Sequence, residues 1–149
     1  MKIEGLMKSP VHTVKPQDSV AHARAILEEY RINQLPVVQN RHLVGIVTDR
    51  DLRDAPEAVE VAASEAAHAS RTQAPNPERI PIEAVMTANV LTLTPGDDVE
   101  DAARLMRRER IGAIPIVERD ALVGILTRSD ILDAFVLVRE QQGSRRGMR

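Results

Sequence analysis

The feature that most constrains this chain is an internal repeat. Residues 7–52 and 86–131 align at a constant offset of 79 residues without a gap, and 17 of the 46 aligned positions are identical. The similarity is densest in GIVTDRD, which begins at Gly45, and in GILTRSD, which begins at Gly124. Self-similarity of this length indicates one supersecondary unit used twice, and two such copies usually bury a common core against each other.

Each copy predicts a short extended segment followed by a helix. The extended segments VHTVKP and VLTLTP end in proline, which keeps the preceding residue out of the helical region. Apolar residues then recur at helical spacing in residues 19–32 and 98–111, with charged residues on the opposite face. We expect amphipathic helices there, with Asp18 and Asp97 as their N-caps.

Two further strands and a second helix complete each copy. The runs LPVV and LVGIVT in the first copy, and IPIV and LVGILT in the second, are dense in β-branched residues and separated by polar breaks. Such runs predict a hairpin of two adjacent strands, and a helical segment follows each hairpin. The sequence therefore predicts an α/β fold of two β-α-β-β-α units, in residues 1–54 and 82–142.

The segments outside the repeats have a different composition. Residues 55–81 are rich in alanine and glutamate and then in proline, which predicts a helix followed by a linker. Residues 143–149 are basic, and we expect them to form a disordered tail.

Composition excludes several classes of protein. No apolar run approaches the roughly 20 residues of a membrane-spanning helix, and cysteine is absent. The first ten residues lack the apolar block of a secretory signal, so a cytoplasmic location is expected. The formal charge is −2, and Tyr30 and Phe135 are the only aromatic side chains that could stack on a base, so nucleic-acid binding is not expected.

No catalytic constellation is visible. The four histidines show no metal-ligand spacing with one another or with carboxylates, and there is no cysteine nucleophile, GxSxG elbow or P-loop. We therefore expect neither an enzyme nor a metal site. Solvated surface histidines are the simplest interpretation of the following four residues: His12, His22, His42 and His68.

The pairs Thr48/Asp51 and Thr127/Asp130 allow two interpretations. A threonine followed three residues later by an acidic residue is the pattern of a capping box at a helix start. The same geometry suits a nucleotide, because the helix N-terminus and the hydroxyl can bind a phosphate and the carboxylate can accept the ribose hydroxyls. A glycine three residues before each threonine would let a ligand approach the strand. The pattern alone leaves these alternatives open.

The two copies resemble CBS motifs, the module named after cystathionine β-synthase, and the pair resembles a Bateman module. The resemblance lies in Met7, in TVKP and TLTP, in RINQLPVV and RIGAIPIV, and in the ends GIVTDRD and GILTRSD. It implies two motifs packed through their sheets with pseudo-twofold symmetry. It also implies nucleotide binding in the clefts between them, with each threonine on a phosphate and each aspartate on a ribose.

The resemblance further implies that each cleft combines residues of both motifs, with the adenine held between aliphatic side chains and read by backbone groups. For most of the aliphatic residues, a place in the core is the alternative. One predicted site comprises Ile125, Thr127 and Asp130 with Val11, Ile32, Asn33 and Pro36. The other comprises Ile46, Thr48 and Asp51 with Val90, Ile111, Gly112 and Pro115.

The two sites are expected to differ in charge. The residue after the threonine is Asp49 in the first copy and Arg128 in the second. Arg128 should attract a phosphate, so the site that contains Asp130 is predicted to bind more tightly.

The leading hypothesis is a regulatory module that requires no cofactor. It would bind AMP, ADP, ATP or S-adenosylmethionine as a regulatory ligand and signal to an effector protein that the sequence does not identify. The family resemblance also implies a disc-like homodimer, to which residues 134–138 could contribute apolar contacts. The alternative is a ligand-free dimeric interaction or scaffold protein in which the Thr/Asp pairs act only as helix caps. A third possibility, a DNA-associated regulator using the basic tail, is weak because the repeats leave no helix-turn-helix.

Overall fold

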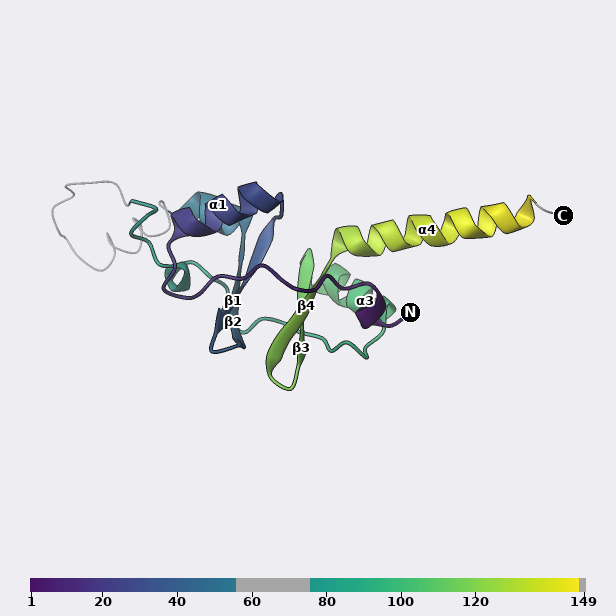
Figure 1. Cartoon of the computed structure of the whole chain (residues 1–149), viewed down its shortest axis with the longest axis horizontal. Coiled ribbons are helices and arrows are strands. Elements are labelled where there is room, and N and C mark those ends of the chain that lie inside the picture. The colour runs from purple at the N-terminus through teal and green to yellow at the C-terminus, as the bar shows by residue number, and fades with distance from the viewer. Residues whose placement is uncertain (56–75, 148–149) are drawn as a thin grey trace. The chain divides into compact units, whose positions relative to one another are not determined.

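The computed structural model describes residues 1–55 and 76–147. The chain divides into two compact units. Figure 1 labels their helices and strands. Unit 1 consists of Met1–Val11 and Leu91–Arg149, and unit 2 consists of His12–Val90. Most of the predicted linker, residues 56–75, lies outside the described residues.

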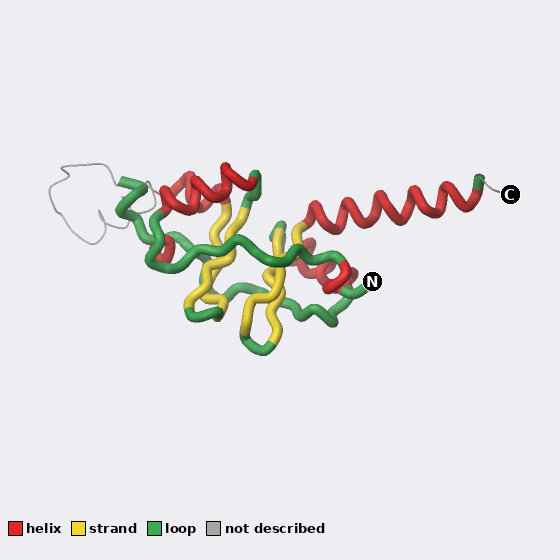
Figure 2. The backbone as a smooth tube through the Cα atoms, in the orientation of Figure 1, coloured by secondary structure: helices red, strands yellow, loops and turns green. Residues whose placement is uncertain are grey.

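Both units contain the order helix, strand, strand, helix, together with one short 3-10 helix. Figure 2 shows the helices and strands along the chain. Unit 2 contains α1 (Val20–Tyr30), β1 (Gln34–Gln39), β2 (His42–Thr48), a helix whose described part covers residues 49–55, and η2 (Ile82–Ala84). Unit 1 contains η1 (Ile3–Gly5), α3 (Val99–Glu109), β3 (Ala113–Glu118), β4 (Ala121–Thr127) and α4 (Arg128–Arg146). Two small antiparallel sheets accompanied by helices confirm the predicted mixed α/β class.

Each sheet is a hairpin closed by a two-residue turn. In unit 2 the turn residues Asn40 and Arg41 have φ angles of 51° and 68°, and in unit 1 Arg119 and Asp120 have 52° and 64°. Positive φ at both central residues belongs to the type I′ turn, whose twist matches that of the strands. The predicted first extended segments contribute only single parallel bridges, Val14 to Val37 and Leu93 to Ile116.

The predicted N-caps Asp18 and Asp97 are wrong. Helices α1 and α3 begin at residues 20 and 99, which makes Ser19 and Asp98 the N-cap residues. The carboxylates of Asp18 and Asp97 instead accept the N–H groups of Lys15 and Thr94, each at 2.8 Å. These carboxylates close the turn that precedes each helix. The short side chain of aspartate reaches a neighbouring backbone amide in a turn as readily as at a helix start.

The two lead-in segments are exchanged between the sequence repeats. Ile3, which precedes the first repeat, is fully buried in the core of unit 1 with α3, β3 and β4. Ile82, which precedes the second repeat, is fully buried in the core of unit 2. The backbone N–H of Ile3 donates to the backbone carbonyl of Asp97 at 2.9 Å, and that of Ile82 donates to the backbone carbonyl of Asp18 at 2.8 Å. Each compact unit therefore combines one repeat with the lead-in of the other.

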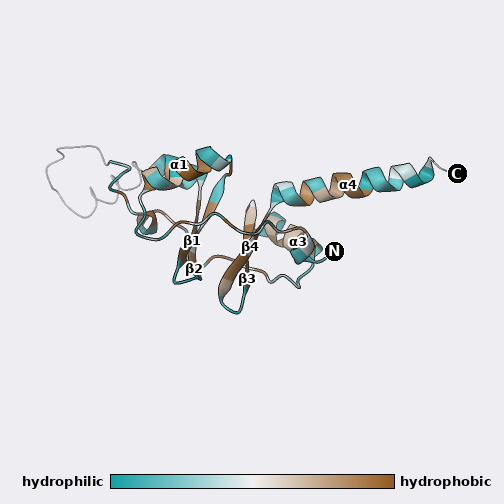
Figure 3. Cartoon of the chain, viewed as in Figure 1, coloured by the Kyte–Doolittle hydropathy of each residue, from teal (hydrophilic) through white to brown (hydrophobic). Residues whose placement is uncertain are grey.

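Helix α4 continues beyond the second repeat. It extends to Arg146, four residues into the segment for which a disordered tail was expected. Figure 3 shows an apolar stretch in the middle of this helix. Its side chains are between 38 and 63% exposed, and they are Leu132, Phe135, Val136, Leu137 and Val138. Among the described residues, no helix combines the length and apolar character needed to cross a bilayer.

Candidate functional site

The Thr127–Asp130 pair of unit 1 begins helix α4. Thr127 is the N-cap, and its Oγ1 accepts the N–H of Asp130 at 3.2 Å. The Oδ2 atom of Asp130 accepts the N–H of Thr127 at 2.9 Å in return. Two amides that the helix leaves unpaired are thereby satisfied, which confirms the capping box.

The Thr48–Asp51 pair of unit 2 makes the same two bonds. Thr48 Oγ1 accepts the N–H of Asp51 at 3.1 Å, and Asp51 Oδ2 accepts the N–H of Thr48 at 3.0 Å. A hydroxyl that accepts a bond still has its proton to donate, and a carboxylate has about four lone-pair sites. The capping box therefore leaves each pair able to contact a phosphate and a ribose.

The segment before each hairpin is held against the start of the following helix. The N–H of Arg128 donates to the carbonyl of Gly112 at 2.9 Å, and the N–H of Asp49 donates to that of Asn33 at 2.7 Å. The Arg128 guanidinium also donates to the Ile111 carbonyl at 3.3 Å. Two backbone segments that were predicted to contribute to ligand sites thus lie beside the Thr/Asp pairs.

The prolines of these segments belong to the sheets. Pro36 and Pro115 are buried and pair with Ile46 and Ile125 in the hairpin register. Their carbonyls accept the N–H groups of Val14 at 3.1 Å and Leu93 at 3.3 Å. The positions of these prolines support a structural role, which was the alternative to ligand contact. Each carbonyl still has one lone pair that could accept a hydrogen bond from a ligand.

Each unit contains some residues of both predicted sites. The combination of residues from one motif with residues from the other in a single site stays a prediction. The other predicted residues are half-buried or exposed, apart from Ile125 and Asp130, which are 8% and 5% exposed. Unit 1 holds Val11, Ile111, Gly112, Pro115, Ile125, Thr127, Arg128 and Asp130. Unit 2 holds Ile32, Asn33, Pro36, Ile46, Thr48, Asp51 and Val90.

The interpretation of the glycines needs correction. A Cβ atom on Gly124 would lie 2.6 Å from the sulfur of Met7, and one on Gly45 would lie 2.5 Å from the sulfur of Met86. The Cβ on Gly124 would also lie 3.2 Å from the carbonyl oxygen of Lys8, and the Cβ on Gly45 would lie 3.0 Å from that of Thr87. Each glycine admits the lead-in segment, so the close approach that the sequence suggested for a ligand is made by the chain itself.

The lead-in also brings a lysine that the sequence interpretation missed. The ammonium of Lys8 lies 3.2 Å from Oδ1 of Asp130, whose side chain is only 6% exposed. The two residues are separated by most of the chain, and no local pattern connects them. The sequence contained one signal, which was a difference between the repeats. Directly after the shared methionines, the first repeat has Lys8 and the second has Thr87.

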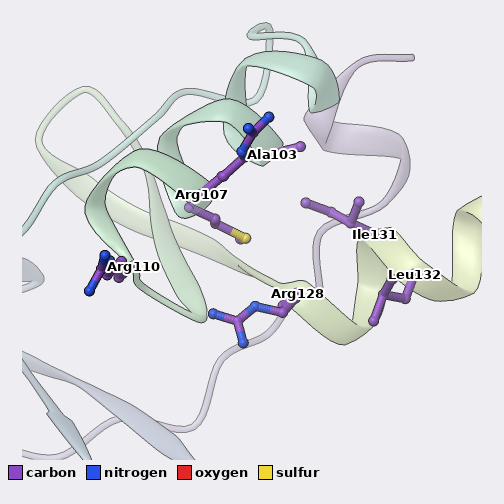
Figure 4. Close-up of a pocket in the computed structure, with 7 residues that line it drawn as sticks. Ala103, Arg107, Arg110, Arg128, Ile131 and Leu132 are labelled. Carbon is purple, nitrogen blue, oxygen red and sulfur yellow. The ribbon is translucent and has the colours of Figure 1, made fainter.

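An arginine-lined hollow of about 350 Å³ lies between α3 and the first turns of α4 (Figure 4). Arg107, Arg110 and Arg128 surround it and form no ion pair with any residue in the described ranges 1–55 and 76–147. At the position equivalent to Ala103 of this hollow, unit 2 has Arg24, whose guanidinium donates to the carbonyls of Leu52 and Arg53. The small side chain of Ala103 thus leaves a hollow in unit 1. At the equivalent position of unit 2 stands the long side chain of Arg24.

The histidines have surface positions within the described part of the chain. His12 stacks on Tyr30 with ring centroids 3.8 Å apart, and His22 and His42 are exposed. His68 lies outside the described residues. No group of three or more histidine, aspartate or glutamate side chains that could hold a metal ion occurs among the residues the structure describes.

Comparison with known proteins identifies both repeats. The model of the CBS domain family matches residues 3–58 and 82–137. A CBS domain-containing protein of Dictyostelium discoideum is 30% identical over 140 residues, which cover 93% of each chain. The similarity extends over both repeats and the segment between them.

Two solved structures similar to this chain contain ligands. The crystal structure of CBSX2 in complex with AMP has a TM-score of 0.74 and 27% identity, and the match covers 93% of this chain and 98% of that one. The CBS domain pair of protein MJ0100 was solved in complex with 5′-methylthioadenosine and S-adenosyl-L-methionine. It has a TM-score of 0.72 and 28% identity, with coverage of 91% and 95%.

Proposed function

Because the chain belongs to the CBS domain family, we propose that it is a regulatory module that binds adenosine-containing ligands. The observation that carries the proposal is the Thr/Asp pair at a helix start in both units, with hydrogen-bonding capacity left after capping. Similar CBS pairs bind AMP in one case and S-adenosyl-L-methionine in another. These are the two classes of ligand that we expect, as regulatory ligands and not as required cofactors.

Each Thr/Asp pair has a defined role in this proposal. The threonine hydroxyl and the first-turn amides of the helix bind the phosphate or its equivalent, since unpaired N–H groups and the helix dipole favour negative charge there. The aspartate accepts the two ribose hydroxyls. Backbone groups of residues 32–33 and 111–112 would read the adenine edge, and Val11, Val90, Ile46 and Ile125 would provide its apolar surroundings.

Ligand binding would act on a partner protein. A ligand shifts a conformational equilibrium only by its difference in affinity for the two states, so a bound nucleotide must change a surface that the partner recognises. We propose that the chain forms a homodimer, relays metabolite state to an effector in the cytoplasm, and catalyses no reaction itself.

Calorimetric titration of the nucleotide-free protein with AMP, ADP, ATP and S-adenosylmethionine tests the proposal. Asp51→Asn and Asp130→Asn each keep the side-chain size but remove the negative charge that accepts the ribose hydroxyls. We expect micromolar binding of at least one ligand, and loss of one site in each variant. A folded protein that binds none of the four ligands would refute the proposal.

A dimeric scaffold without a ligand is the second candidate, and the exposed apolar stretch of α4 favours it. Five large apolar side chains in Leu132–Val138 are exposed, which is typical of a surface that another protein covers. Leu132→Lys and Phe135→Lys should dissociate the dimer in sedimentation experiments if this stretch is the interface. Nucleotide affinity that persists in the dissociated variants would separate ligand binding from assembly.

A further inference from the structure

We propose that Lys8 makes the two Thr/Asp pairs selective for different ligands. The pair in unit 1 prefers a phosphorylated adenosine ligand such as AMP, and the pair in unit 2 prefers an uncharged or cationic adenosyl compound. This inference rests on the proposed function, because it names the ligand class of each of the same two sites.

The backbone fixes the position of Lys8. Its N–H donates to the carbonyl of Ile125 at 2.9 Å, and its carbonyl accepts the N–H of Ile125 at 3.0 Å. Ile125 lies two residues before Thr127 on β4, so this pairing places Lys8 beside the Thr/Asp pair. The ammonium then reaches Oδ1 of Asp130 at 3.2 Å while the lysine side chain remains 66% exposed.

Lys8 does not use all of the acceptor capacity of Asp130. The Thr127 amide uses one lone pair on Oδ2, and the ammonium uses one on Oδ1. One acceptor site therefore remains on each oxygen for the two hydroxyls of a ribose. A ribose can bind while the ammonium stays close, and the lysine then adds a positive charge beside the bound ligand.

Unit 2 has the same backbone arrangement without this charge. Thr87 exchanges both hydrogen bonds with Ile46, at 2.9 Å and 3.0 Å, as Lys8 does with Ile125. The helix that follows begins with Asp49 in place of Arg128, and Arg53 lies 3.7 Å from Asp49 and offsets its charge. No lysine equivalent to Lys8 therefore lies beside Asp51. Among the residues that the structure describes, no cationic side chain forms an ion pair with Asp51.

The difference in charge has opposite consequences for the two ligand classes. A phosphate group carries −1.5 to −2 charges at neutral pH, so Lys8 and Arg128 favour it in unit 1. A sulfonium such as that of S-adenosylmethionine is repelled there, whereas the net negative charge of Asp51 in unit 2 attracts it. 5′-Methylthioadenosine has neither charge and serves as the neutral reference.

The experiment measures ligand preference at one site at a time. Asp51→Asn leaves the unit 1 pair intact, and Asp130→Asn leaves the unit 2 pair intact. Each is titrated with AMP, 5′-methylthioadenosine and S-adenosylmethionine, with thermal unfolding as the control for folding. We expect AMP to bind most tightly in Asp51→Asn, and S-adenosylmethionine or 5′-methylthioadenosine to bind most tightly in Asp130→Asn.

The reciprocal exchange tests Lys8 directly. Adding Lys8→Thr to Asp51→Asn should weaken AMP about fivefold, the effect of one partly exposed charge pair, and leave 5′-methylthioadenosine unchanged. Adding Thr87→Lys to Asp130→Asn should strengthen AMP by a similar factor. The same ligand preference at both sites, or no response to either exchange, would overturn the inference while leaving nucleotide binding established. Absence of binding by all three ligands in the unmodified protein would instead overturn the proposed function, and this inference with it.

Discussion

In unit 1 Asp130 is 5% exposed and its carboxylate lies beside the ammonium of Lys8. In unit 2 Asp51 is half-buried, and the residue that matches Lys8 is the uncharged Thr87. The backbone around them is the same in both units, including the capping bonds, the hairpin register and the lead-in pairing. The residues that the repeats share fix the geometry of the Thr/Asp pairs. The residues that differ between the repeats set the charge around that geometry.

The largest expected effect comes from the exchanged lead-ins. Ile3→Ala and Ile82→Ala each remove a fully buried side chain, so each should lower the free energy of unfolding by about 2–5 kcal/mol. The two substitutions should destabilise different units. Hydrogen exchange should accelerate first in β3 and β4 for Ile3→Ala, and first in β1 and β2 for Ile82→Ala.

The opposite pattern, with each substitution destabilising the repeat that follows it in sequence, would contradict the exchange of lead-ins. Ile32→Ala is a suitable control, because this isoleucine is only half-buried against the core of unit 2. It should cost less than Ile82→Ala in the same unit.

The next effect tests whether the glycines serve the lead-ins. Gly45→Ala and Gly124→Ala add a methyl group that must displace a flexible methionine and press on a backbone carbonyl, which should cost about 1–3 kcal/mol. Gly45→Ala should cost more, because its backbone contact is 3.0 Å and that of Gly124 is 3.2 Å. Urea unfolding measures both, and Gly5→Ala, with open space at the Cβ position, is the control.

Adding Met7→Ala to Gly124→Ala should recover part of the loss, because the shortened side chain makes room for the new methyl. If the two substitutions are strictly additive, the glycine has a role other than admitting the methionine.

A smaller effect distinguishes the two helix pairs. Arg24→Ala removes charge-assisted bonds to the Leu52 and Arg53 carbonyls, so it should destabilise the protein by about 1 kcal/mol. Ala103→Arg places the same side chain in the hollow of unit 1, where Arg107, Arg110 and Arg128 repel it. Thermal unfolding should therefore show no gain in stability for Ala103→Arg. A gain comparable to the loss in Arg24→Ala would show that the two positions are interchangeable.

The sequence predicted the hairpins, the helices and the Thr/Asp pattern at the helix starts. Hairpins, helices and capping boxes depend on local patterns, such as Thr127 followed by Asp130, and those patterns occur twice. The N-caps at Asp18 and Asp97 were missed because an aspartate near a helix start can bond to the preceding turn equally well. Composition and spacing do not distinguish these two partners of the carboxylate.

The Lys8–Asp130 pair and the exchanged lead-ins were not accessible to local patterns. Both depend on contacts between residues that lie far apart in the sequence. The hydrophobic effect is not directional, so an apolar side chain such as that of Ile3 would suit either core. The combinations of residues across the two motifs remain predictions that the titrations described above would test.

The smallest expected effect concerns an ion pair that only unit 1 has. Lys2 Nζ lies 2.9 Å from Asp98 Oδ1, while the matching residues of unit 2 are the uncharged Pro81 and Ser19. The hydrogen bond and charge of Lys2 lower the pKa of Asp98, and those of Asp98 raise the pKa of Lys2. A lowered carboxyl pKa contributes stability above its ordinary value of 3.8, and this is lost as pH falls through the folded value. A raised lysine pKa contributes stability below 10.5, which is lost as pH rises through the folded value.

Asp98→Asn should therefore be slightly less stable than the unmodified protein between these limits, and the difference should disappear in acid and at high salt. Both side chains are exposed, so the loss should be smaller than that of any substitution above. Ser19→Ala is the matched control in unit 2, because it removes the N-cap bond to the His22 amide, which involves no titrating group. Unfolding midpoints measured across the pH range should diverge for Asp98→Asn and stay parallel for Ser19→Ala. If both variants follow the unmodified protein in parallel, the ion pair contributes nothing to folding and is not one of the differences in stability between the units.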